Sequence, residues 1–74
     1  MYKYLTVCER LFHKNIGSYV SYGILCINEE TGAVVSKISD VSTKRSFVLR
    51  LSKKFTEKEL SPCHFFDAVE DSLE

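Results

Sequence analysis

Apolar and polar side chains alternate along the first forty residues in three runs, and this pattern predicts three β-strands. The first run covers residues 2–12, the second 19–27 and the third 33–39. The second half of the middle run is apolar on both faces, which is typical of a strand covered from both sides. Gly23 lies inside this run and indicates a bulge or the close approach of another backbone. Turn-forming residues separate the runs, so neighbouring strands are expected to pair as antiparallel hairpins.

The apolar positions that follow have a helical period, and they fall within about 100° of one another on a helical wheel. They are Phe47, Val48, Leu51 and Phe55. This stripe predicts an amphipathic helix, with residues 40–43 offering several capping side chains before it. Leu49 is the exception, because it projects from the polar side of this helix.

The last quarter of the chain carries the start signals of a second helix. Ser61 is expected to cap it by accepting from free backbone N–H groups of the first turn, and Pro62 suits the first helical position. Leu60 and Phe65 occupy the two positions of a hydrophobic staple. The side chains expected on the buried face of this helix are Phe65, Phe66, Val69 and Leu73.

The element order is therefore β-β-β-α-α, and 74 residues allow a single small domain over residues 1–74. We expect an α+β fold, a three-stranded antiparallel β-meander followed by two α-helices packed on one face. The other face of the sheet is expected to expose several side chains from one set: Tyr2, Tyr4, Tyr19, Leu25, Ile27 and Val35. A symmetric homodimer would cover this surface.

The formal net charge is zero, but the charges are unevenly distributed. Residues 1–55 hold nine basic and four acidic side chains, whereas residues 56–74 hold one basic and six acidic ones. Two interpretations follow. Either the acidic end packs near the basic body, or the protein presents a surface with two poles that steers a charged partner.

Cys63 and His64, with Asp67 and Asp71 nearby, form the one cluster whose side chains suit thiol chemistry or metal binding. As a nucleophile and base the pair is poorly placed, because adjacent helix residues diverge by about 100°. The cysteines also lack the short spacing that structural zinc sites usually show. We therefore expect no catalytic residue, no cofactor and no metal ligand, with thiol- or metal-dependent activity at Cys63 and His64 kept as an alternative.

A basic cluster marks the first helix, since no acid occurs between Val41 and Thr56. Such a helix can contact phosphates, so weak nucleic-acid binding is a further alternative. The neutral overall charge and the acidic second helix disfavour it.

Compartment can also be judged from the sequence. Three cysteines cannot all pair within one chain, no signal-peptide run is present, and no apolar stretch approaches a membrane span. We expect free thiols, a cytoplasmic location and no membrane association.

Three segments resemble motifs of a family of small uncharacterised proteins from Firmicutes. They are the Tyr-Gly-Ile of residues 22–24, the Ile-Ser-Asp-Val-Ser of 38–42 and the Leu-Ser-Pro-Cys-His-Phe-Phe-Asp-Ala-Val-Glu-Asp of 60–71. In that family the segments recur in this order, although Ala68 stands where Val is usual. The resemblance implies a bacterial cytoplasmic protein of unknown function, and it implies no catalytic residue.

The leading functional hypothesis is a non-enzymatic binding or regulatory module that acts through protein–protein contacts or self-association. Its expected contacts are the exposed sheet face, the basic first helix and the acidic arc of the last helix. The residues singled out for this surface are Leu49, Arg45, Arg50, Lys53, Asp67, Glu70, Asp71 and Tyr19.

Overall fold

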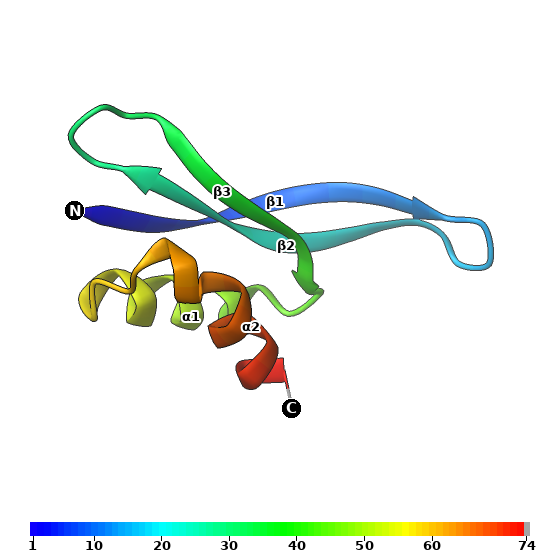
Figure 1. Cartoon of the computed structure of the whole chain (residues 1–74). Helices are drawn as coiled ribbons and strands as arrows, with labels where there is room; N and C mark the ends of the chain where they lie inside the picture. The colour runs from blue at the N-terminus through cyan, green and yellow to red at the C-terminus, as the bar shows by residue number, and fades with distance from the viewer. Residues whose placement is uncertain (74) are drawn as a thin grey trace.

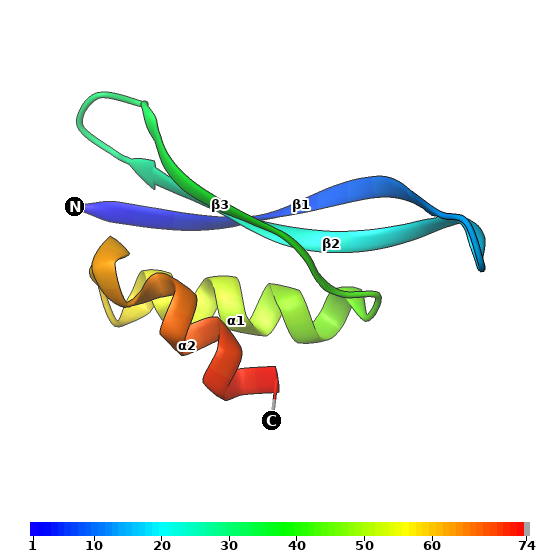
Figure 2. The same ribbon diagram turned by 45° about the vertical axis from the view of Figure 1, so that its right-hand side comes forward.

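The computed structural model describes residues 1–73 and shows three strands followed by two helices (Figure 1). The elements are β1 (Tyr2–His13), β2 (Gly17–Asn28), β3 (Val34–Ser42), α1 (Arg45–Glu57), a single 3-10 turn η1 (Pro62–His64) and α2 (Phe65–Leu73). The sheet is antiparallel with the order β1-β2-β3. Both helices lie on one face of it (Figure 2). The predicted α+β meander is confirmed.

The register of β1 against β2 decides which side chains face the helices. Tyr4 pairs with Cys26, and Thr6 pairs with Ile24, so these four residues share one face. Tyr4, Cys26 and Ile24 are buried there. The expectation that Tyr4 belongs to the bare face was wrong, and so was that for Tyr2, which packs against the same core. Alternation alone gave two faces of β1 but not which of them the helices would cover.

Three aromatic rings form the centre of the core. Tyr4 meets Phe65 edge to face with ring centroids 5.0 Å apart, and Phe55 meets both Tyr4 and Phe65 in the same way. The hydroxyl of Tyr4 donates to the backbone carbonyl of Leu60 at 2.7 Å. Burial, together with contact to Cys26, raises the pKa of this hydroxyl. The phenol is therefore a neutral core group whose polar end is satisfied.

The predicted faces of the helices are only partly right. Val48, Leu51 and Phe55 of α1 are buried as expected. In α2, Phe65 and Val69 are buried, but Phe66 is 61% exposed and Leu73 is also exposed. The four positions span an arc of about 100° on the helix, and only the two at one margin of it, Phe65 and Val69, are buried.

The predicted caps are also wrong in detail. Lys44 is the N-cap of α1 and Ser61 is the N-cap of η1, and neither side chain makes a capping hydrogen bond. The hydroxyl of Ser61 instead contacts Sγ of Cys63 at 3.3 Å. Pro62 does occupy the start of the last helical segment. Residues 40–42, which the sequence offered as caps, belong to β3, since this strand extends to Ser42 and not only to residue 39.

An irregularity interrupts the pairing of β2 and β3 beside Gly23. A β-carbon at Gly23 would lie 2.5 Å from the backbone oxygen of Ile38 and 2.9 Å from Oε1 of Glu9, so only glycine fits. Asp40, on the irregular part of β3, has a φ of 53°, which aspartate tolerates better than most residues. Gly23 therefore marks a close approach, as its place in the strand predicted.

Candidate binding groove

A groove of about 350 Å³ runs between β1 and α1. The strand contributes one wall and the helix the other. The lining residues are Lys3, Tyr4, Leu5 and Thr6 from β1 with Leu49, Ser52, Lys53, Thr56 and Glu57 from α1. Leu49, which the sequence placed on the polar side of α1, is 39% exposed and lies in this wall.

Hydroxyl groups hold α1 against the outer edge of β1. The backbone N–H of Tyr4 donates to Oγ1 of Thr56 at 2.9 Å, and the backbone carbonyl of Tyr4 accepts from the same hydroxyl at 3.2 Å. The hydroxyls of Thr6 and Ser52 bond to each other at 2.8 Å. These contacts fix the width of the groove at its floor.

Beyond Tyr4 the outer edge of β1 has no partner in the described chain. Backbone groups of an antiparallel strand point alternately toward and away from the neighbouring strand. The N–H of Tyr4 points away from β2, toward Thr56, so those of Thr6 and Cys8 point to the same outer side. No hydrogen bond within residues 1–73 engages these outward groups of Thr6 and Cys8. A strand edge of this kind can pair with another extended chain.

The charges around the groove are mainly positive. Lys3 and Lys53 stand on its two walls, with Glu57 as the one acid of the lining. Arg45 and Arg50 are exposed on the same helix. The groove therefore combines apolar surface, to which Leu49 contributes from the helix, with a field that favours carboxylates.

The remaining predicted surface residues lie elsewhere. Asp67, Glu70 and Asp71 are exposed on α2. Within residues 1–73 no ion pair joins them to the cations of α1, and the ion pair that is present connects Lys37 to Glu9. The hydroxyl of Tyr19 donates to Asp40 at 2.9 Å, which raises the pKa of that hydroxyl.

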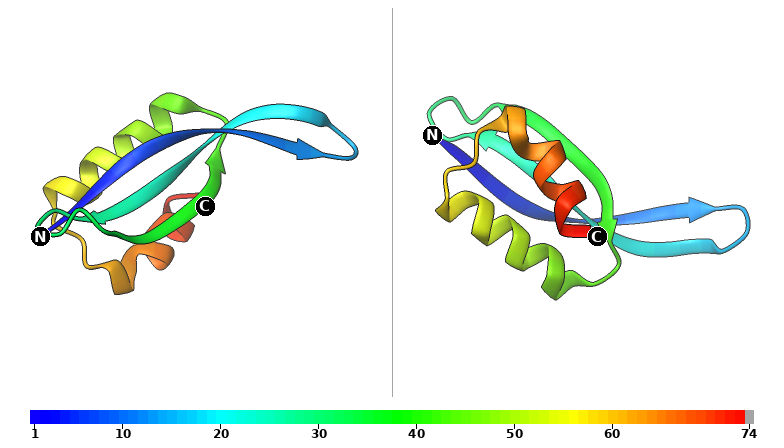
Figure 3. Two further views of the ribbon diagram at one scale, coloured as in Figure 1. Left: turned by 90° about the horizontal axis from the view of Figure 1, so that it is seen from above. Right: turned by 60° about the horizontal axis from the view of Figure 1, so that its bottom comes forward.

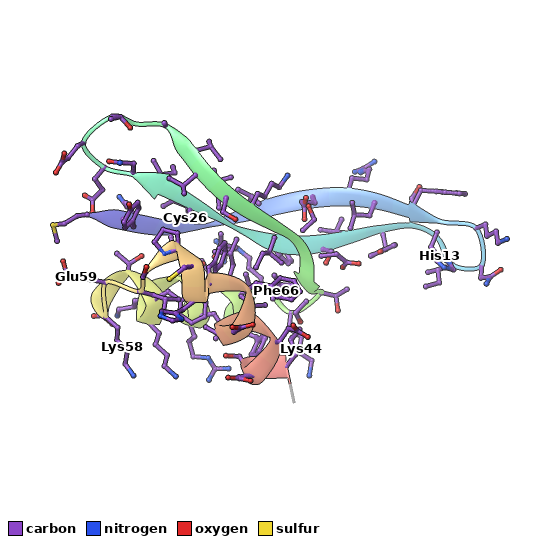
Figure 4. All side chains as sticks on the ribbon, viewed as in Figure 1. His13, Cys26, Lys44, Lys58, Glu59 and Phe66 are labelled. Atoms are coloured by element: carbon purple, nitrogen blue, oxygen red, sulfur yellow. The ribbon has the colours of Figure 1, made fainter. Side chains whose placement is uncertain are left out.

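Cys63 and His64 are both exposed in the single turn η1. All three cysteines are unpaired, with Cys26 buried and Cys8 exposed on β1. Figure 4 shows His13 at the far end of the β1–β2 hairpin, well away from Cys26. In the part of the chain that the structure describes, no three His, Cys, Asp or Glu side chains are placed to hold a metal ion together.

Most of the residues that line the groove carry no signal in the sequence. Leu49 and Lys53 were singled out, but Lys3, Leu5 and Thr56 were not. The available signal was Ser52, a polar residue inside the buried stripe of α1, which indicates a hydroxyl partner on the facing strand. The network around Glu9 was missed as well, because its partners on β3 are distant in sequence.

The fold and the groove define a small α+β domain in which, over the described residues 1–73, the outer edge of β1 is unpaired beyond Tyr4. A family model described as a family of unknown function (DUF6514) matches residues 1–74, and the chain belongs to this family. No curated protein and no solved structure matches the chain. Over residues 1–73, neither helix has the length and apolar character needed to cross a membrane.

Proposed function

We propose that this chain is a non-enzymatic binding module that takes an extended segment of a partner protein onto the outer edge of β1. The observation that carries the proposal is the meeting of two features at one place. The unpaired backbone groups of Thr6 and Cys8 belong to the strand whose residues 3–6 line the apolar groove opposite Leu49. Strand addition uses both kinds of contact, since main-chain hydrogen bonds supply affinity and side-chain pockets supply specificity.

The groove also specifies the kind of segment that fits. Its backbone would pair with β1 from Thr6 onward, because Thr56 already occupies the edge at Tyr4. One apolar side chain of the segment would pack on Leu49. Acidic side chains would lie near Lys3 and Lys53, where opposite charge speeds association and sets the register. The partner segment is thus extended, acidic and partly apolar.

The alternative functions use other residues. An exposed thiol at Cys63 and phosphate contacts by the cations of α1 stay separate predictions, since the groove requires neither. Binding would regulate the partner protein, because its bound segment could no longer contact other molecules.

The experiment is a selection of random displayed peptides on the immobilised full chain. Enriched peptides are expected to combine acidic residues with an apolar anchor. The Leu49→Glu variant should bind these peptides at least ~10-fold more weakly. Truncating a hot-spot residue, or placing a charge there, costs more than about 1.4 kcal/mol of binding free energy. Ser46→Glu adds the same charge to an exposed position of the same helix and should bind like wild type. Peptides that bind wild type and Leu49→Glu equally would contradict the proposal.

A second pair of variants tests the strand edge itself. Cys8→Pro removes an outward N–H without removing a bond of the β1–β2 ladder, a position where proline is tolerated. Peptide binding should be lost in Cys8→Pro and kept in Cys8→Ala, with circular dichroism showing that both remain folded. Full binding by a folded Cys8→Pro protein would show that the edge is not the site.

A further inference from the structure

The β1–β2 hairpin continues well beyond the rest of the molecule. Figures 1 and 3 show its outer half extending past the end of β3 and past both helices. We call this part, residues 10–20, the arm. Three large apolar side chains of the arm are exposed, Phe12 by 73%, Ile16 by 71% and Val20 by a smaller fraction.

One face of the arm continues the face that is buried elsewhere in the sheet. By register, Val20 pairs with Arg10, and both have the parity of the helix-facing residues Tyr4 and Ile24. Phe12 has this parity too. The helices of the same chain end before they reach the arm (Figure 3), so its continuation of the core face is left without cover. Exposed apolar residues grouped in this way indicate a contact surface.

A second exposed apolar pair lies on α2. Phe66 and Leu73 are seven residues apart, so they lie on the same side of the helix. The side chain of Phe66, labelled on α2 in Figure 4, is 61% exposed. Three exposed acids lie along one side of this pair, Asp67, Glu70 and Asp71, and residues 65–73 contain no lysine or arginine.

The arm and α2 have opposite charges. Residues 10–28 contain no acid, and the arm carries Arg10 and Lys14 beside its apolar side chains. We propose that two copies of the chain associate by laying the arm of each copy on α2 of the other. Phe12 and Val20 of one copy would cover Phe66 and Leu73 of its partner, with the cations of the arm facing the acids of the helix.

Each chain carries one arm and one α2, so the same contact can form twice between two copies. Two copies related by a two-fold axis satisfy both halves at once, and neither an arm nor an α2 is left unpaired. This dimer goes beyond the proposed peptide binding and does not depend on it. The groove residues Leu5 and Leu49 take no part in it, so either proposal can fail alone.

Charge reversal gives a sharp test of the contact. One variant is Arg10→Glu with Lys14→Glu, and the other is Asp67→Lys with Glu70→Lys; all four positions are exposed. Wild type should sediment as a dimer. Each variant alone should dissociate at least ~10-fold more readily, since its arm and its α2 then have the same sign. An equal mixture of the two should form a heterodimer, because each arm again meets an α2 of opposite sign.

The apolar part of the contact is tested by Phe12→Asp, with Val35→Asp as control. Val35 is an exposed apolar residue of β3, outside the proposed contact. Phe12→Asp should weaken the dimer by ~10-fold or more, and Val35→Asp should leave it unchanged. A monomeric wild type would overturn the proposal. A dimer indifferent to both charge reversals would overturn it too, because the contact would then lie elsewhere on the chain.

Discussion

Oε1 of Glu9 accepts the backbone N–H of Asp40 at 3.0 Å, so β1 is joined directly to β3 across the central strand. The other carboxylate oxygen accepts from the hydroxyl of Ser39 at 3.0 Å and pairs with Nζ of Lys37 at 3.2 Å. The side chain can cross β2 because Gly23 has no β-carbon in its path. Glu9 therefore ties the two outer strands of a small sheet that has helices on one face only.

This relationship predicts a pH dependence of stability. Partial burial by itself raises the pKa of Glu9, but the hydrogen bonds from Asp40, Lys37 and Ser39 outweigh it and hold the pKa below its ordinary value. A lowered pKa in the folded state means that this stabilisation is present above the unfolded pKa, about 4.3, and is lost as pH falls through the folded pKa. Glu9→Gln should cost about 1–3 kcal/mol at neutral pH and flatten the acid side of the stability curve. Urea titrations at several pH values measure both effects, and an unchanged acid limb would contradict the assignment.

Gly23→Ala should destabilise the sheet. The added β-carbon would meet the backbone oxygen of Ile38 at 2.5 Å, and a backbone atom cannot move aside as a flexible side chain can. We expect a loss of about 1–3 kcal/mol, the usual cost of overpacking. The double variant Gly23→Ala with Glu9→Gln should lose less than the sum of the two single variants, because both act on the same crossing. Thermal or urea unfolding measures this, and strict additivity would show that the two sites are independent.

Adjacent phenylalanines at the start of α2 offer a matched comparison. Phe65 is 1% exposed and packs against the rings of Tyr4 and Phe55, whereas Phe66 is exposed. Phe65→Ala should cost roughly 3–5 kcal/mol, enough to unfold a domain of this size, while Phe66→Ala should change stability by about 0.5 kcal/mol or less. Equal melting temperatures for the two variants would contradict the orientation of α2.

The sequence predicted the elements well because their signals are local. Period-two and helical patterns located all three strands and both helices, and Pro62 located the start of the last segment. The predictions of which side chains are buried and which are exposed were less accurate. The placement of Tyr4 depends on its pairing with Cys26, and the exposure of Phe66 depends on where α2 meets the sheet. Neither relation is encoded within a single element.

The groove was also predictable only where its signal lies within a single element. Leu49 could be recognised as an apolar residue out of place on a polar helix face. Its neighbours Leu5 and Thr6 could not, because the contact joins residues more than forty positions apart through hydroxyl bonds such as Thr6 to Ser52. Side chains that meet across such a distance leave no periodic signal in the sequence.

Hydrogen exchange of the β1 amides in the presence of a selected peptide tests the binding proposal most directly. The outward N–H groups of Thr6 and Cys8 have no hydrogen-bond acceptor within residues 1–73, so they should exchange readily in the free protein. On binding, strand addition should slow their exchange by ~10-fold or more, as expected for a gain of about 1.4 kcal/mol in protection. Leu5 and Val7 already bond to β2 and should change far less. Unchanged exchange at Thr6 and Cys8 in a saturated complex would contradict the account.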